Sequence, residues 1–200
     1  ADRVAGYLLN PMNQEEASQL PLYTAAAYLA RPAAYRPDAA WRDAARRLAP
    51  DAAGAAVLLE FAAYAQSSMV QAQEAPQLTA ALAAYARGSF GASWRLKRQF
   101  ASMVSLPARL AGAVPPEFYD EVQPWAAALR DEGEAGLLAL GVDTAVARRN
   151  RPAVQAGLPD LRRALANLKA QQATAHVAGN LVEDFLAGVV SRAEGLGPEM

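Results

Sequence analysis

Residues 115–129 read PPEFYDEVQPWAAAL. The bulky apolar side chains of this segment recur every three or four positions, at Phe118, Val122, Trp125 and Leu129. Because an α-helix completes a turn in about 3.6 residues, this spacing places them on one helical face. The leading proline pair suits the first turn of a helix, and Pro124, inside the pattern, predicts a kink.

The helical pattern extends from this segment in both directions. It continues to about Arg148, and Gly133 and Gly136 within it would let a neighbouring helix approach closely. Residues 66–75 are polar and predict a loop, and Gly88–Gly91 predicts a break between helices. Further helices are expected over residues 14–29 (with Asn13 as cap and Pro21 as a kink), from Pro37, from Pro50, after Pro76, from about Ala92 (bent or ended by Pro107), over residues 160–171 and over residues 180–192.

Composition supports a fold built from helices. Apolar residues make up 53% of the 200-residue chain, and many are alanine, the residue with the highest helix propensity. β-Branched residues are sparse, and no sheet-forming periodicity follows Pro11. Since the expected connections are mostly short, sequential helices should pack antiparallel. The predicted fold is therefore all-α, a bundle of mostly antiparallel, proline-punctuated helices preceded by a short extended segment.

Charge and residue inventory exclude several classes of function. With 19 basic and 20 acidic side chains, the net charge of −1 gives no electrostatic reason to expect nucleic acid or an anionic membrane as partner. No apolar run approaches the roughly 20 residues of a membrane span. The absence of cysteine excludes disulfides, thiolate metal sites and a cysteine nucleophile. His176 is the only histidine and is interpreted as a surface residue, so no metal or cofactor is predicted.

The remaining polar and aromatic clusters have ordinary structural interpretations. Adjacent acids could serve glycoside hydrolysis, but neighbours on a helix point about 100° apart, which favours solvated charge. They occur at Glu15-Glu16, Asp120-Glu121, Asp131-Glu132 and Glu183-Asp184. Basic clusters are interpreted as helix surface and the three tryptophans as core anchors. These are Arg46-Arg47, Arg95 with Lys97-Arg98, Arg148-Arg149 with Arg151, Arg162-Arg163, Trp41, Trp94 and Trp125. Side-chain chemistry alone therefore does not indicate an enzyme.

The first residues break the helical pattern. Val4–Leu9 is a short apolar run that Asn10-Pro11 ends, and it predicts a buried strand or an extended arm. A single strand is not stable alone, because its backbone groups need partners. The segment therefore predicts that structure is missing upstream of this chain.

The same region carries a family resemblance. Residues 6–18, GYLLNPMNQEEAS, resemble a segment of glycoside hydrolase family 84, the bacterial hyaluronidase-like β-N-acetylglucosaminidases and protein O-GlcNAcases. LPLYTAAAYL at residues 20–29 and AYRPDAAW at residues 34–41 are similar to that family too. A weaker similarity lies in VQPW at residues 122–125 and GEAG at residues 133–136.

The resemblance implies a place in a larger enzyme. In this family the Asn-Pro-Met segment closes the last strand of a (β/α)₈ barrel, and a helical post-catalytic domain follows. The family's adjacent catalytic aspartates lie earlier in the barrel, and this chain has no Asp-Asp pair. The family mechanism is retaining and substrate-assisted, with the acetamide of the sugar as nucleophile. Asn10 matches the family asparagine that hydrogen-bonds sugar hydroxyls, although it could instead only order the turn before Pro11.

The resemblance thus predicts a division into a barrel remnant over residues 1–12, a helical bundle over 13–194 and a tail over 195–200. The bundle would have no catalytic activity alone, would support its own barrel and would border the groove for an N-acetylglucosamine-bearing glycan or glycoprotein. Helical regions of some family members mediate dimers, so the resemblance is compatible with a homodimer and, for a bacterial member, with secretion. The alternatives are a free-standing helical interaction module and a small-molecule pocket between helices.

Overall fold

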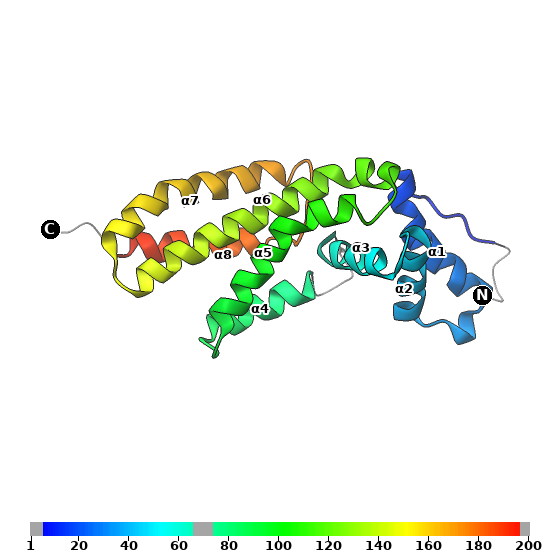
Figure 1. Cartoon of the computed structure of the whole chain (residues 1–200), viewed down its shortest axis with the longest axis horizontal. Helices are drawn as coiled ribbons and strands as arrows, with labels where there is room; N and C mark the ends of the chain where they lie inside the picture. Colours follow the sequence, from blue (N-terminus) through cyan, green and yellow to red (C-terminus); the bar gives the residue numbers. More distant parts are fainter. Residues whose placement is uncertain (1–5, 66–73, 197–200) are drawn as a thin grey trace. The chain divides into compact units, whose positions relative to one another are not determined.

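A computed structural model describes residues 6–65 and 74–196 of the chain (Figure 1). These residues form helices and connecting turns and contain no strand, so the all-α prediction is confirmed. None of the described helices is long and apolar enough to cross a membrane. The helices are α1 (Glu15–Ala30), the 3₁₀ turn η1 (Pro32–Ala34), α2 (Pro37–Leu48), α3 (Ala52–Ala65), α4 (Pro76–Ala86), α5 (Ala92–Ala111), α6 (Pro116–Ala147), α7 (Arg151–Gln171) and α8 (Leu181–Glu194).

The chain divides into two compact units. Unit 1 comprises Ala1–Ala62 and Ala108–Gln123, and unit 2 comprises Ala63–Pro107 and Pro124–Met200. Within α5 and α6 the division falls at Pro107 and Pro124, both inside their helices. A proline in a helix interior removes one backbone hydrogen bond, so each helix has its weakest backbone where it passes from one unit to the other.

Unit 1 is built on the packing of α1 against α2. Its core contains Leu20, Ala44, Ala45, Leu58, Phe61, Leu110 and Phe118, all buried. Alanines at the contact between two helices let their backbones approach, which explains why α2 buries Ala44 and Ala45 while its arginines stay exposed. Glu60 and Arg109 form a bidentate ion pair at 2.8 and 2.9 Å within this unit.

Unit 2 contains α4, most of α5 and α6, and the antiparallel pair of α7 and α8 (Figure 1). Its core includes Leu78, Leu96, Phe100, Met103, Leu129, Leu161 and Leu186. The rings of Phe100 and Phe185 stack with centroids 5.8 Å apart, which joins α5 to α8. The predicted close approach at the two glycines is confirmed: a Cβ atom on Gly133 would lie 2.8 Å from the Phe100 carbonyl oxygen, and one on Gly136 would meet the Phe100 ring.

Most predicted helix starts are confirmed, and two features differ. Pro37, Pro76 and Pro116 open their helices. Of the two alternatives predicted for Pro107, an end of the helix is wrong, because α5 continues through it to Ala111. Helix α7 begins at Arg151, nine residues before the predicted start, because the Asn150 side chain accepts a hydrogen bond from the Ala153 amide at 3.2 Å and caps it. The expected loop lies mostly at residues 66–73, outside the described residues.

Candidate functional site

The N-terminal segment, residues 6–14, is neither helix nor strand in the described structure. Of the run that predicts a strand, Val4 and Ala5 lie outside the described residues. The apolar side chains of the segment face solvent, with Tyr7 58%, Leu8 99%, Leu9 42% and Met12 52% exposed. Isolated exposed apolar residues are ordinary, whereas four large ones occur here within residues 7–12.

Asn10 lies in the middle of this exposed run. Its side chain is exposed and makes no hydrogen bond to any residue in the described part of the chain. An amide both donates and accepts hydrogen bonds, which suits vicinal hydroxyl groups of a sugar. The structure brings no second residue with a predicted site role next to Asn10.

Two contacts fix the segment where it enters α1. The Oγ atom of Ser18, a buried residue, donates to the Gln14 carbonyl at 2.6 Å and lies 3.5 Å from the Met12 carbonyl. Glu121 of α6 accepts a hydrogen bond from the Ala17 amide at 3.0 Å. Asn13 was predicted to cap this helix, but the N-cap residue is Gln14, and its side chain makes no cap hydrogen bond. The carboxylate of Glu121 takes over this role, because it is an anion beside unpaired amides at a helix N-terminus.

The prediction that the adjacent acids are all solvated is wrong for Glu132, which belongs to the Asp131-Glu132 pair. Glu132 of α6 is buried, with its Oε2 atom lacking a hydrogen-bond partner, and the Oε1 atom of Glu183 in α8 lacks one too. Burial first, and then the charge of Glu183, raises the pKa of Glu132 from 4.5 to about 9. Burial also raises the pKa of Glu183. Neither carboxyl group lines the two cavities described below, which favours a structural interpretation over general acid catalysis.

A second buried acid was not singled out from the sequence. Asp143 of α6 is 9% exposed and accepts hydrogen bonds from the Tyr85 hydroxyl at 2.8 Å and from the Arg192 Nε at 2.9 Å. The pKa of the Tyr85 hydroxyl is raised, mainly by burial and then by the hydrogen bond to Asp143 and the negative charge of Asp143. This cluster joins α4, α6 and α8, and none of its buried side-chain oxygen or nitrogen atoms lacks a partner, as a structural network requires.

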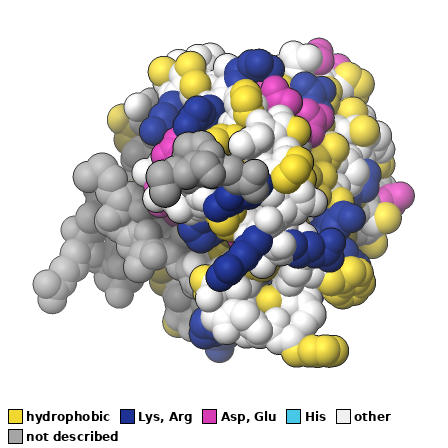
Figure 2. Space-filling view, turned by 90° about the vertical axis from the view of Figure 1, so that its left-hand side faces the viewer, with side chains coloured by type: hydrophobic (Ala, Val, Ile, Leu, Met, Phe, Trp, Pro, Cys, Tyr) yellow, Lys and Arg dark blue, Asp and Glu magenta, His cyan; other side chains and the backbone are white. Residues whose placement is uncertain are grey.

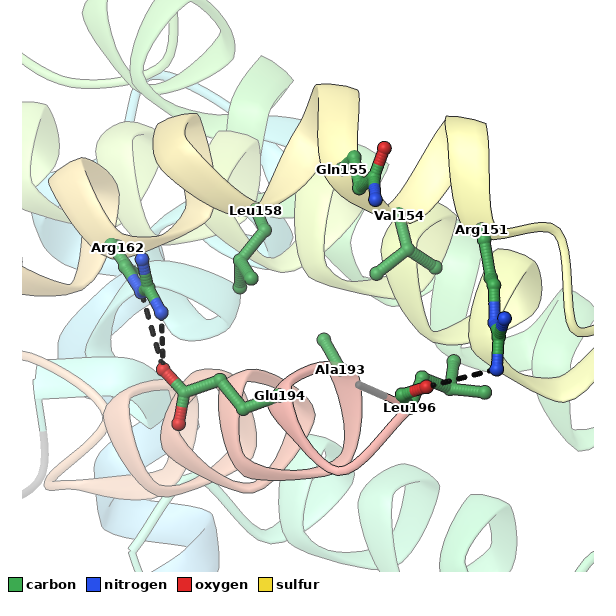
Figure 3. A pocket seen from close by; sticks show the side chains of 8 residues that line it. All are labelled: Arg151, Val154, Gln155, Leu158, Arg162, Ala193, Glu194 and Leu196. Atoms are coloured by element: carbon green, nitrogen blue, oxygen red, sulfur yellow. Dashed lines mark hydrogen bonds and ion pairs between the residues drawn. The ribbon is translucent and has the colours of Figure 1, made fainter. Parts of the chain in front are cut away.

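A cavity of about 260 Å³ lies between α7 and α8 (Figure 3). Arginines stand at its two ends: Arg151 donates to the Leu196 carbonyl at 3.4 Å, and Arg162 pairs with Glu194 at 2.6 Å. Apolar side chains, including Val154, Leu158 and Ala193, lie between them. A second cavity of about 370 Å³ is bordered by α6 and α7, with Asp131, Leu138 and Asn167 in its lining. Two carboxylates, Asp131 and Glu134, line the second cavity, and Arg130 forms an ion pair with each of them, at 3.2 and 3.9 Å.

The other predicted residues are dispersed. His176 is exposed, in agreement with its interpretation as a surface residue, and the described residues contain no group of three acids or histidines that could hold a metal ion. Trp41 and Trp125 are half-buried, but Trp94 is 60% exposed, so its prediction as a core anchor is wrong. It lies on the outer face of α5, where the Arg98 guanidinium stands 4.7 Å from the centroid of its ring.

Comparisons with known proteins address the family resemblance. The family model for β-N-acetylglucosaminidase matches residues 1–63. A mutant of the Thermobaculum terrenum O-GlcNAc hydrolase is 25% identical over 98% of this chain and 43% of its own, with a TM-score of 0.84. CpGH84B and CpGH84D share the fold at 19% and 15% identity, with TM-scores of 0.78 and 0.72 over 94% and 93% of this chain and 34% of each of theirs. A search of the curated proteins returned no match.

This chain therefore spans less than half of the length of each solved relative. The family model covers the N-terminal segment with Asn10, α1 and α2, and ends within α3. The O-GlcNAc hydrolase extends the similarity across the helices of both units. The predicted resemblance to the β-N-acetylglucosaminidases of glycoside hydrolase family 84 is thereby confirmed, and the chain is similar to a helical domain of that enzyme family.

Proposed function

We propose that this chain is the helical domain that follows the catalytic barrel in a β-N-acetylglucosaminidase. One observation carries the proposal: the segment that the family model matches exposes four large apolar side chains around Asn10. In the complete enzyme, residues 1–12 would supply the last barrel strand, and the apolar side chains would be covered by the neighbouring strands and helices. Burying them would stabilise the assembly by about 25 cal/mol for each Å² of apolar surface removed from water.

In this proposal the domain is not catalytic. Its two most perturbed carboxyl groups belong to Glu132 and Glu183, which lie on α6 and α8 in unit 2, whereas Asn10 lies in unit 1. The general acid and the group that orients the acetamide would come from the barrel. The helices would support the barrel and border the groove that receives the peptide or glycan bearing N-acetylglucosamine.

Asn10 would contribute sugar binding from the carboxyl end of its strand, where active sites of (β/α)₈ barrels lie. The side-chain amide has no competing hydrogen bond among the described residues, so it is available to the sugar. Its carbonyl and amino groups would pair with adjacent hydroxyls. Removing both interactions should weaken transition-state binding as well as substrate binding, because the hydroxyls stay engaged throughout the reaction.

The test uses the longer protein that contains this chain, with an aryl β-N-acetylglucosaminide as substrate. Asn10→Ala should lower kcat/KM by roughly tenfold to a hundredfold, equivalent to about 1.4–2.7 kcal/mol. Asn13→Ala is the matched control, because Asn13 is an exposed asparagine of the same segment, and it should leave kcat/KM within about twofold. The 200-residue chain alone should be inactive.

Three results would contradict the proposal. Hydrolysis by the 200-residue chain would place the catalytic groups within it. A longer protein that lacks activity although it is folded, or one with no barrel before residue 1, would leave a helical interaction module as the better account.

A further inference from the structure

The turn between α4 and α5 presents two aromatic side chains to solvent. We name residues 87–98 the α4–α5 tip; in it Phe90 is 99% exposed and Trp94 is 60% exposed. Gly88 and Gly91 take φ values of 65° and 69°, which permits a tight turn, and Arg95 donates to the Phe90 carbonyl at 2.9 Å. Phe90 therefore lies in a hydrogen-bonded turn, and Figure 1 shows this connection at the lower end of the α4–α5 pair.

Four cations lie in the same segment as the two aromatic rings. Arg87, Arg95, Lys97 and Arg98 are all exposed, and none of them pairs with a carboxylate among the described residues. Acids are also absent from the surrounding sequence, since residues 75–116 contain no Asp or Glu. Figure 2 shows Lys and Arg side chains among hydrophobic ones in the lower part of the face it views, while Asp and Glu lie mostly in its upper part.

The net charge of −1 conceals this local excess. The net charge of the whole chain gave no reason to expect an anionic membrane as partner. The tip, however, combines exposed aromatic rings with exposed cations, as membrane-surface segments do. Aromatic rings are favoured at the water–lipid boundary, and Lys or Arg beside them attract anionic headgroups. In the tip, the Arg98 guanidinium lies over the Trp94 ring, so one cation is held directly beside one aromatic ring.

The shape of the tip selects among anionic partners. A base or a sugar needs a cleft or platform, whereas Phe90 is 99% exposed and its ring contacts no other aromatic ring of the described residues. A convex apex with a fully exposed ring instead suits a soft layer into which the ring can insert. We propose that the α4–α5 tip docks this domain on the surface of an anionic lipid membrane, with Phe90 and Trp94 in the interfacial layer and the four cations on the headgroups.

The experiment measures co-sedimentation of the 200-residue chain with vesicles. Vesicles of phosphatidylcholine mixed with phosphatidylserine should bind the chain, and vesicles of phosphatidylcholine alone should not. Phe90→Ser should weaken binding by roughly tenfold, because an inserted aromatic ring is lost. Arg87→Ala with Lys97→Ala should weaken it by roughly tenfold or more and reduce its dependence on salt.

The matched control is Arg148→Ala with Arg149→Ala, which removes two exposed cations of the same unit that are not part of the tip and should leave binding within about twofold. A second readout uses Trp41→Phe with Trp125→Phe, which leaves Trp94 as the only tryptophan; its fluorescence should shift to the blue on phosphatidylserine vesicles. If the chain with Trp41→Phe and Trp125→Phe does not fold, co-sedimentation of the chain that retains all three tryptophans decides the outcome.

Three results would overturn the proposal. One is an absence of binding to the phosphatidylserine vesicles at low salt. Another is an equal loss of binding in the control variant, which would show attraction by overall charge rather than by the tip. The third is a dimer in solution that Phe90→Ser converts to a monomer, because the tip would then contact a second copy of this chain.

Discussion

Glu132 places a carboxyl group inside unit 2, where burial and the nearby Glu183 raise its pKa from 4.5 to about 9. The folded state therefore keeps a proton that the unfolded state releases above pH 4.5. The contribution of Glu132 to the free energy of unfolding is complete below pH 4.5 and is lost as the pH rises toward about 9. Over this range the free energy of unfolding should fall by about 1.4 kcal/mol per pH unit from this group.

Glu132→Gln mimics the protonated acid and cannot ionise. We expect it to flatten this slope and to stabilise the chain more at mildly alkaline pH than at mildly acidic pH, as measured by urea unfolding across the range. Glu134→Gln is the control, because Glu134 is exposed on the same helix and its replacement should preserve the slope. Parallel pH profiles for the original chain and Glu132→Gln would show that Glu132 ionises freely in the folded state.

Asp143 supports a different prediction, because its two oxygens accept from the Tyr85 hydroxyl and the Arg192 guanidinium. Asp143→Ala leaves a half-buried hydroxyl without its acceptor, which should cost about 2–4 kcal/mol of the free energy of unfolding. Asp160→Ala removes only an exposed ion pair with Arg163 on α7 and should cost less than about 0.5 kcal/mol. Similar losses in the two variants, measured by denaturant titration, would refute the proposed role of Asp143.

The burial of individual side chains was the feature least predictable from the sequence. Glu132 and Asp131 are adjacent acids on one helix, yet Glu132 is buried and Asp131 is only half-buried. Helical periodicity does contain a signal, since Leu129, three residues before Glu132, and Gly133, directly after it, are both buried. Trp94 shows the opposite error: it was predicted to be buried and is exposed, because an aromatic residue next to an apolar stripe need not belong to that stripe. Burial of these side chains depends on the neighbouring helices, which local sequence does not specify.

Helix α6 packs against α5 through Gly133, where an added Cβ would lie 2.8 Å from a backbone oxygen and 2.9 Å from both the Met103 Cβ and the Val104 nitrogen. Backbone atoms cannot yield without moving the helix, so Gly133→Ala should lower the free energy of unfolding by about 1–3 kcal/mol. The same substitution at Gly141 of α6 meets nothing within 4 Å and should raise stability by about 0.5–1 kcal/mol. Thermal unfolding of both variants compares the signs directly, and stabilisation by Gly133→Ala would show that the helices are not in close contact.

Helix existence was largely predictable, whereas helix limits were not. Apolar spacing and opening prolines located α2, α4 and α6, since both signals are local. For α7 the predicted start at residue 160 was too late: the helix begins at Arg151, with Pro152 in its first turn and Pro159 inside it. The signal that was overlooked is Asn150, a cap residue three positions before the amide it binds. Continuation through Pro107 in α5 likewise depends on tertiary packing.

The N-terminal segment and α8 should differ sharply in what they contribute to the whole chain. Residues 6–11 are exposed, so deletion of residues 1–11 should preserve the helical circular dichroism and change the free energy of unfolding by less than about 1 kcal/mol. Deletion from residue 181 onward removes the fully buried Val182, Leu186 and Val189. Each of these costs about 2–5 kcal/mol to lose, against a total stability of about 5–15 kcal/mol, so that chain should not fold. Unfolding of the first deletion would show that the N-terminal segment completes the core of this domain, and it would remove the reason to place its apolar side chains against a barrel.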